Sequence, residues 1–124
     1  TCWKLASLSS TTPPIAAISL VFADPARREA LLTHIAPHYS LVDIPRCAAE
    51  QWPRLALGIN DISVFERTHA WDHAAGVLFL NEAGGMAARP DGSPYRVDEP
   101  RRTGLLGAAS PALWDQLALR MAGI

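Results

Sequence analysis

The stretch from Trp71 to Gly85 constrains the fold more than any other part of the chain, because it is typical of a short apolar helix with both ends marked. Asp72 opens it, and Asp is preferred at helix starts because its carboxylate accepts hydrogen bonds from unpaired backbone N–H groups. Gly84 and Gly85 suit the left-handed turn that commonly ends a helix. Apolar residues recur between these ends at helical spacing, which predicts a buried stripe. The members of that stripe are Trp71, Ala74, Ala75 and Leu78.

Asp72 has two interpretations at this position. The helix dipole places partial positive charge at the helix start, so the carboxylate is favoured in its ionised form. An ionised carboxylate on a rigid helix start is well placed to hold a metal, but an ordinary helix cap has the same appearance. The pattern alone leaves both interpretations open.

The rest of the chain alternates strands and helices, which predicts an α/β fold with a layered mixed β-sheet flanked by helices. The almost continuous apolar run over 15–22 is expected of a strand buried on both faces. The alternating run over 62–67 is expected of a half-buried strand. A strand over 86–89 is predicted to join a second strand around Tyr95 through the turn at 90–92. Further strands are predicted over 40–44 and 104–109, and further helices from Asp24, over 48–57, and from Ser110 with Leu113, Trp114, Leu117 and Met121 facing the core.

Length and composition indicate one globular domain. The chain has 124 residues, of which 49% are hydrophobic and 19% charged, so it can bury a sizeable core and is not disordered. Residues 1–14, which end in a Ser/Thr/Pro-rich stretch, are assigned to a linker or tail, and residues 15–124 to the domain. Thr1 stands where an initiator Met is usual, so we expect a processed product or a fragment.

Charge and cysteine content exclude several classes of partner. The net charge is -1 and the basic residues form no tract longer than a pair such as Arg101-Arg102, so we expect no nucleic-acid surface. No apolar run is long enough to span a membrane, and no secretory signal is recognisable. Cys2 and Cys47 are too few for a disulfide framework, which favours a reduced, cytoplasmic setting.

The string Trp71-Asp72-His73-Ala74-Ala75-Gly76, followed by Glu82-Ala83-Gly84-Gly85, resembles the C-terminal signature of the inositol monophosphatase family of metal-dependent phosphatases. That signature runs Trp-Asp-x-Ala-x-Gly and then Glu-Ala-Gly-Gly. Upstream, residues 47–49 and 55–58 resemble the family's small-residue loop and the helix after it. Downstream, residues 91–95 and 104–109 resemble its Asp-Gly hairpin and last buried strand.

The resemblance implies a Mg2+-dependent phosphatase, often a dimer, that acts on a phosphorylated small molecule such as a sugar, polyol or nucleotide phosphate. It implies that Asp72 is a metal ligand and that backbone groups of Cys47 and Ala48 contact the substrate. Small residues at a strand-to-helix turn let a ligand approach backbone N–H groups closely, which agrees with that role. Close packing of a helix on a sheet would favour the same residues.

The chain departs from the family pattern in two places. The family's remaining metal ligands lie in an N-terminal half, in a Glu-bearing helix and an Asp-Pro-(Ile/Leu)-Asp-Gly-Thr string, and neither string occurs here. Phe65 stands where the inositol-binding members carry an acidic residue. Its neighbour Glu66 could serve after a one-residue bulge, or Arg67 could receive an anionic group of the substrate. A solvated strand end is the alternative for both residues.

We therefore expect the C-terminal domain of a magnesium-dependent phosphatase, with little or no activity as an isolated chain. Its partner in catalysis would be the missing N-terminal half. The alternative is a non-catalytic fragment or degenerate relative that folds and associates but hydrolyses nothing.

Overall fold

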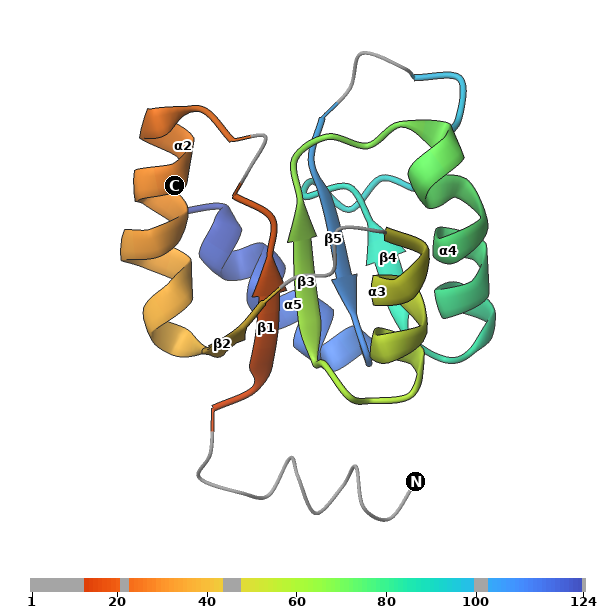
Figure 1. Cartoon of the computed structure of the whole chain (residues 1–124), viewed down its shortest axis with the longest axis horizontal. Helices are drawn as coiled ribbons and strands as arrows, with labels where there is room; N and C mark the ends of the chain where they lie inside the picture. The colour runs from red at the N-terminus through yellow and green to blue at the C-terminus, as the bar shows by residue number, and fades with distance from the viewer. Residues whose placement is uncertain (1–12, 21–22, 44–47, 100–102, 124) are drawn as a thin grey trace.

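The computed structural model describes residues 13–20, 23–43, 48–99 and 103–123, with the backbone alone at 48, 49, 70 and 72 (Figure 1). Its centre is one five-stranded sheet in the order β2-β1-β3-β5-β4. The strands are β1 (Ile15–Ile18), β2 (Ser40–Val42), β3 (Ile62–Phe65), β4 (Met86–Ala88) and β5 (Leu105–Ala108). Because β1 runs parallel to β2 and β3 while β5 runs antiparallel to β3 and β4, the sheet is mixed, as predicted.

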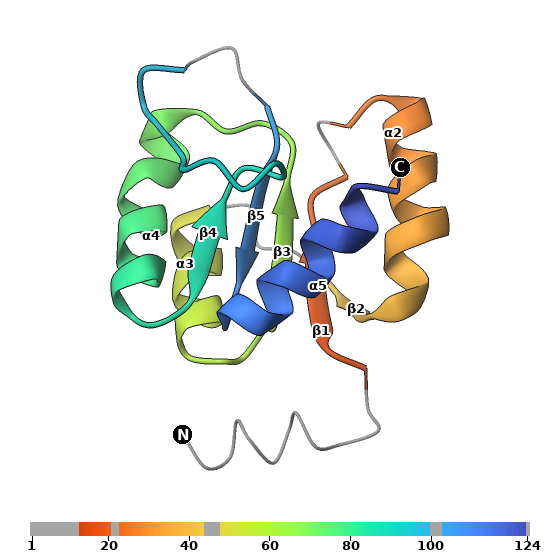
Figure 2. The ribbon, with the colours of Figure 1, turned by 180° about the vertical axis from the view of Figure 1, so that it is seen from behind.

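Helices cover both faces of the sheet. On one face, α5 (Pro111–Met121) packs beside the segment that connects β1 to β2 (Figure 2). That segment comprises α2 (Pro25–Ala30), the π-helical turn η1 (Leu31–Ile35) and the 3-10 turn η2 (Ala36–His38). On the other face, α3 (Ala48–Ala56) and α4 (Ala70–Glu82) lie side by side (Figures 1 and 2). Within the described residues, no helix combines the length and the hydropathy needed to cross a membrane.

Strand β3 contributes to a separate apolar core on each face of the sheet. Ile62 and Val64 join the core under α5, whereas Phe65 joins the core under α3 and α4. All residues of β3 are buried, so the expectation of a half-buried strand was wrong. The polar member of the alternating pattern, Ser63, is buried with its hydroxyl donating to the Ala17 carbonyl at 2.8 Å, which satisfies its hydrogen-bonding group inside the core.

Helix α5 confirms the cap and the face predicted for it. Ser110 Oγ accepts a hydrogen bond from the Leu113 backbone N–H at 3.3 Å. Pro111 follows in the first turn, where a backbone N–H would have no intrahelical acceptor, so its missing N–H costs nothing. All its predicted core residues are buried. Trp114 Nε1 also donates to the Leu106 carbonyl at 3.0 Å, which fixes the helix on β5.

Helix α4 begins earlier than predicted. Its N-cap is His69, whose side chain makes no capping hydrogen bond, and its first residue is Ala70. Asp72 is therefore the third helical residue and not the cap. It still lies in the first turn, where the helix dipole favours negative charge.

The predicted buried stripe of α4 was wrong. Trp71 is 80% exposed and Leu78 is 62% exposed, and the residues that face the core are His73, Val77 and Leu80. Gly76 explains this orientation, because an added Cβ would lie only 2.1 Å from Cδ1 of the buried Trp52. The helix turns its smallest residue toward α3, and its largest residue consequently faces outward.

The end of α4 agrees with the sequence. Gly84 has a φ of 97°, a conformation that favours glycine. The Gly85 N–H donates to the Leu80 carbonyl at 3.0 Å, and the Gly84 N–H donates to the Asn81 carbonyl at 3.4 Å. This is the Schellman arrangement that a double glycine after an apolar helix predicts.

The hairpin predicted around Tyr95 is wrong, because no strand forms there and β4 pairs with β5 instead. Asp91 Oδ1 accepts hydrogen bonds from both the N–H and the hydroxyl of Ser93, at 2.9 and 2.6 Å, which closes a local turn. Pro94 follows this turn and has no N–H to donate to a ladder. The chain leaves β4 after one further backbone bond, from Arg89 N–H to the Ser93 carbonyl at 2.9 Å.

Candidate functional site

β1 and β3 are neighbouring strands, and the segments that follow their carboxyl ends leave the sheet on opposite faces. After β1 the chain enters α2 and η1 on the α5 face, and after β3 it enters α4 on the other face (Figures 1 and 2). In open α/β sheets, ligands bind in the crevice that such a divergence creates. A ligand site is therefore expected at this edge of the sheet.

A cavity of about 410 Å³ lies at this edge, within the range of small-molecule sites. Ala23, Asp24 and Arg27 reach it from the segment after β1, and Glu66 and Arg67 reach it from the loop after β3. Thr103, just before β5, completes the described lining. The cavity thus brings together the two predicted substrate-loop residues, Glu66 and Arg67, with side chains from a distant part of the sequence.

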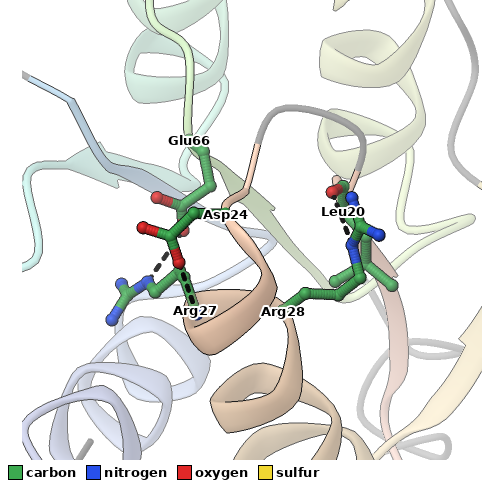
Figure 3. Close-up of polar contacts among 5 residues, drawn as sticks. All are labelled: Leu20, Asp24, Arg27, Arg28 and Glu66. Carbon is green, nitrogen blue, oxygen red and sulfur yellow. Dashed lines mark hydrogen bonds and ion pairs between the residues drawn. The ribbon is translucent and has the colours of Figure 1, made fainter.

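Two of the residues that line this cavity form an ion pair. Arg27 Nε donates to Glu66 Oε1 at 3.1 Å (Figure 3). The Glu66 side chain is 14% exposed and the Arg27 side chain 31% exposed, so the pair is more shielded than a surface pair. Asp24 Oδ1 accepts the Arg27 backbone N–H at 2.7 Å, which caps α2 and holds Arg27 in the first turn.

Phe65 and Glu66 point to opposite sides, as neighbours in an extended chain do. The Phe65 ring is buried against Trp52 and His73, with centroid distances of 5.1 and 4.7 Å. Glu66 is directed instead toward α2, where it meets Arg27. The described chain thus places an apolar ring at residue 65 and an acid that faces the cavity at residue 66.

The loop that contains Arg67 is held to α4. The Arg67 side chain is exposed and lines the cavity, while His73 Nε2 donates to its backbone carbonyl at 3.1 Å. His73 is itself buried between Trp52 and Phe65. The segment that connects the cavity to the start of α4 is therefore anchored at the residue next to Asp72.

The remaining predicted site residues are only partly described. Asp72 lies in the first turn of α4, on the same edge of the sheet, but its side chain lies outside the described atoms. Cys47 lies outside the described residues, and Ala48 is described only as the first residue of α3. Among the described residues, no three His, Cys, Asp or Glu side chains lie close enough together to hold a metal ion. Magnesium prefers several oxygen ligands, so these residues do not complete a magnesium site.

Arg89 is a buried cation beside the site that the sequence did not indicate. Its Nη1 donates to Thr68 Oγ1 and to the Gly104 carbonyl, both at 2.9 Å. Its guanidinium lies 4.8 Å from the centroid of the Tyr95 ring, and the Tyr95 hydroxyl donates to the Thr68 carbonyl at 2.8 Å. The group ties the loop before α4 to the start of β5. A lone Arg at the end of a strand gives no sequence signal for this role, and Arg27, in a run of solvated-looking charges, gave none either.

Comparison with known proteins identifies the family of this chain. Residues 11–121 match the model of the inositol monophosphatase family. A chloroplast phosphatase of Arabidopsis thaliana, IMPL1, is 37% identical over 71 residues, which are 57% of this chain and 19% of that protein.

Solved structures share the fold. The inositol monophosphatase of Anabaena (Nostoc) superposes with a TM-score of 0.75 at 20% identity, over 91% of this chain and 44% of that one. The inositol monophosphatase of Zymomonas mobilis gives a TM-score of 0.75 at 18% identity, over 89% of this chain and 42% of that one. The chain therefore spans less than half the length of these solved relatives.

Proposed function

Because the chain belongs to the inositol monophosphatase family, we propose that it is the C-terminal domain of a magnesium-dependent phosphatase for sugar, polyol or nucleotide phosphate monoesters. The observation that supports this most directly is the position of Asp72. It lies in the first turn of α4, the helix that the loop containing Glu66 and Arg67 leads into. A carboxylate there is favoured in its ionised form by the helix dipole, which is the form that a hard cation needs.

In this proposal Asp72 is a metal ligand, and backbone groups of Cys47 and Ala48 contact the substrate. Glu66 and Arg67 line the cavity that receives the part of the substrate beyond the phosphate. Bound magnesium supplies a Lewis acid and an activated water for hydrolysis of the ester. The contribution of the described residues is to position the substrate and the first turn of α4 relative to each other.

A second domain is proposed to cover the outer face of α4. This helix is apolar on both sides, and Trp71, Leu78 and Phe79 are exposed by 80%, 62% and 50%. Helices that are apolar all round are normally buried all round. The N-terminal half typical of the family is the proposed occupant, and it would bring the further metal ligands to the start of α4. Homodimerisation and a cytoplasmic location are parts of the same proposal.

A non-catalytic association domain is the second candidate function. It is favoured by the finding that the described residues contain no cluster able to hold a metal. Such a domain would still use the outer face of α4 to bind a partner, so the two functions differ in turnover and not in association.

Co-expression with an N-terminal half of a family member distinguishes the two functions. We expect the chain alone to release little or no phosphate from sugar phosphates, because one carboxylate cannot organise the electrostatic stabilisation that this chemistry needs. We expect magnesium-dependent phosphate release when the two halves associate. A stable complex without turnover would favour the association domain, and turnover by the chain alone would contradict the need for outside ligands.

A further inference from the structure

We propose that the cavity between α2 and the loop after β3 is a subsite for an oxyanion of the substrate other than the phosphate that is hydrolysed, and that Arg27 binds it. The inference rests on the proposed phosphatase function and narrows its substrate class. The preferred substrates would carry a second phosphate or a carboxylate group in addition to the scissile phosphate monoester.

The Arg27 guanidinium has two nitrogens that can bind an oxyanion. This group has five N–H donors, and Nε is occupied by Glu66 Oε1 at 3.1 Å. Nη1 and Nη2 make no hydrogen bond to the part of the chain that the structure describes. They lie on the side of the guanidinium away from Glu66 (Figure 3). A carboxylate on Nε thus fixes the plane of the group and leaves a two-pronged edge, the arrangement that binds oxyanions in a bidentate manner.

Two acidic side chains share the cavity with Arg27. Asp24 and Glu66 also line it, and both carboxylates would repel an anion if they were uncompensated. Glu66 accepts the Arg27 Nε–H and Asp24 accepts the Arg27 backbone N–H, so each has a donor. Asp24 is exposed, which lets solvent and salt screen its charge. Arg67 also lines the cavity and adds a second cation to it.

The acid of the loop after β3 stands at residue 66 and not at residue 65. Glu66 faces α2 and is committed to Arg27, whereas Phe65 fills the preceding residue with a buried ring. A carboxylate held by a guanidinium is a poorer acceptor for substrate hydroxyls than an unpaired one. Glu66 is therefore a positioning residue for Arg27, and the group presented to the substrate is a donor edge for an anion.

The test uses the whole chain without metal, with inorganic phosphate as the probe. Phosphate is titrated into the isotope-labelled protein in the presence of a chelator, and amide resonances are followed by NMR. We expect saturable shifts at Arg27, Glu66 and Arg67. Arg27→Gln should weaken phosphate binding about tenfold, as expected for loss of a charge-assisted bidentate contact. Arg27→Lys should also weaken it, because an ammonium can meet Glu66 but lacks the fork.

The matched control is Arg54→Gln. Arg54 forms an ion pair with Glu50 at 2.6 Å on α3, outside the cavity lining, so its removal tests the general effect of losing one Arg–Glu pair. Phosphate affinity should be unchanged in this variant. Equal affinities of Arg27→Gln and Arg54→Gln, or no binding by the wild-type chain, would overturn the subsite.

A kinetic comparison separates this inference from the proposed function. In the associated halves, Arg27→Gln should raise KM for a sugar bisphosphate by about tenfold more than for the matching monophosphate, with kcat little changed. If the associated halves are active and Arg27→Gln changes KM equally for both substrates, the subsite is contradicted and the proposed phosphatase function still stands. If phosphate binds at Arg27 but the associated halves hydrolyse no ester, the phosphatase function is contradicted and the anion site still stands.

Discussion

The variant Gly76→Ala tests the orientation of α4 on the sheet. An ideal Cβ at this residue would lie 2.1 Å from Trp52 Cδ1 and 2.4 Å from Trp52 Cγ, whereas contacting carbon atoms prefer about 3.5–4.0 Å. Trp52 is fully buried, and its ring lies 5.1 Å from that of Phe65 and 5.9 Å from that of His73. The indole therefore has packed neighbours and cannot simply rotate into solvent.

Two effects of this substitution oppose each other. Ala is preferred over Gly inside a helix by about 0.8–1.0 kcal/mol, which would stabilise the variant. Overpacking of a well-packed core typically costs about 1–3 kcal/mol and occasionally more. The clash with Trp52 involves a rigid buried ring and not a flexible side-chain end. We therefore place the overpacking cost at about 3 kcal/mol, the upper end of that range, and expect a net loss of about 2 kcal/mol in the free energy of unfolding.

Urea denaturation followed by circular dichroism measures this effect. With a typical dependence of about 1–3 kcal/mol per M urea, the midpoint should fall by roughly 1 M. Gly123→Ala is the matched control, because the nearest atom to its added Cβ is the Arg120 carbonyl oxygen at an ordinary 3.5 Å. A Gly76→Ala variant as stable as wild type, or more stable, would show that this face of α4 does not contact Trp52.

Further predictions concern stability and association. Trp71→Ala should change the free energy of unfolding by only about 0.5 kcal/mol, because Trp71 is largely exposed. Trp52→Ala should lower it by about 3–5 kcal/mol, and both variants are compared by urea denaturation. Arg89→Met should cost about 1–3 kcal/mol by the same method, since the buried Gly104 carbonyl loses a donor. Leu78→Lys should leave the thermal melt of the chain nearly unchanged but weaken association with an N-terminal half about tenfold in a titration; unchanged association would exclude that face.

Local chemistry made several elements predictable from the sequence. Ser110-Pro111 and the double glycine at 84–85 each specify backbone geometry through interactions within one turn, and the structure has both. The apolar face of α5 was predictable because its partners are all apolar, so period and burial agree.

The orientation of α4 was not predictable by the same reasoning. The helix is apolar nearly all round, so helical spacing could not identify its buried side, and the stripe predicted from that spacing, which includes Trp71, is the wrong one. The deciding contact is between Gly76 and Trp52, which lie on different helices. Gly76 determines which side of α4 is buried, because it leaves room for the Trp52 ring. The sequence does not reveal this, because it does not show that Trp52 packs against Gly76.

In the site, too, residues in a local motif could be predicted from the sequence, whereas contacts between distant segments could not. The family resemblance predicts Glu66 and Arg67 as substrate-binding residues, and both line the same cavity. The Arg27–Glu66 pair joins residues 39 apart in sequence, and the Arg89 group joins the end of β4 to two other segments. Such pairs depend on the register of the sheet, which composition and periodicity do not determine.

The most direct test of the central claim is Asp72→Asn in the associated halves, with magnesium titrated in a phosphate-release assay and a thermal melt on the same preparation. Asp72 lies in the first turn of α4 and is not its cap, so loss of its charge removes only a helix-dipole interaction of about 0.3–1 kcal/mol and the melt should change little. Asn is a far poorer ligand for a hard cation, so turnover should be lost and partly restored at high magnesium. Turnover equal to wild type at limiting magnesium would contradict the assignment of Asp72 as a metal ligand.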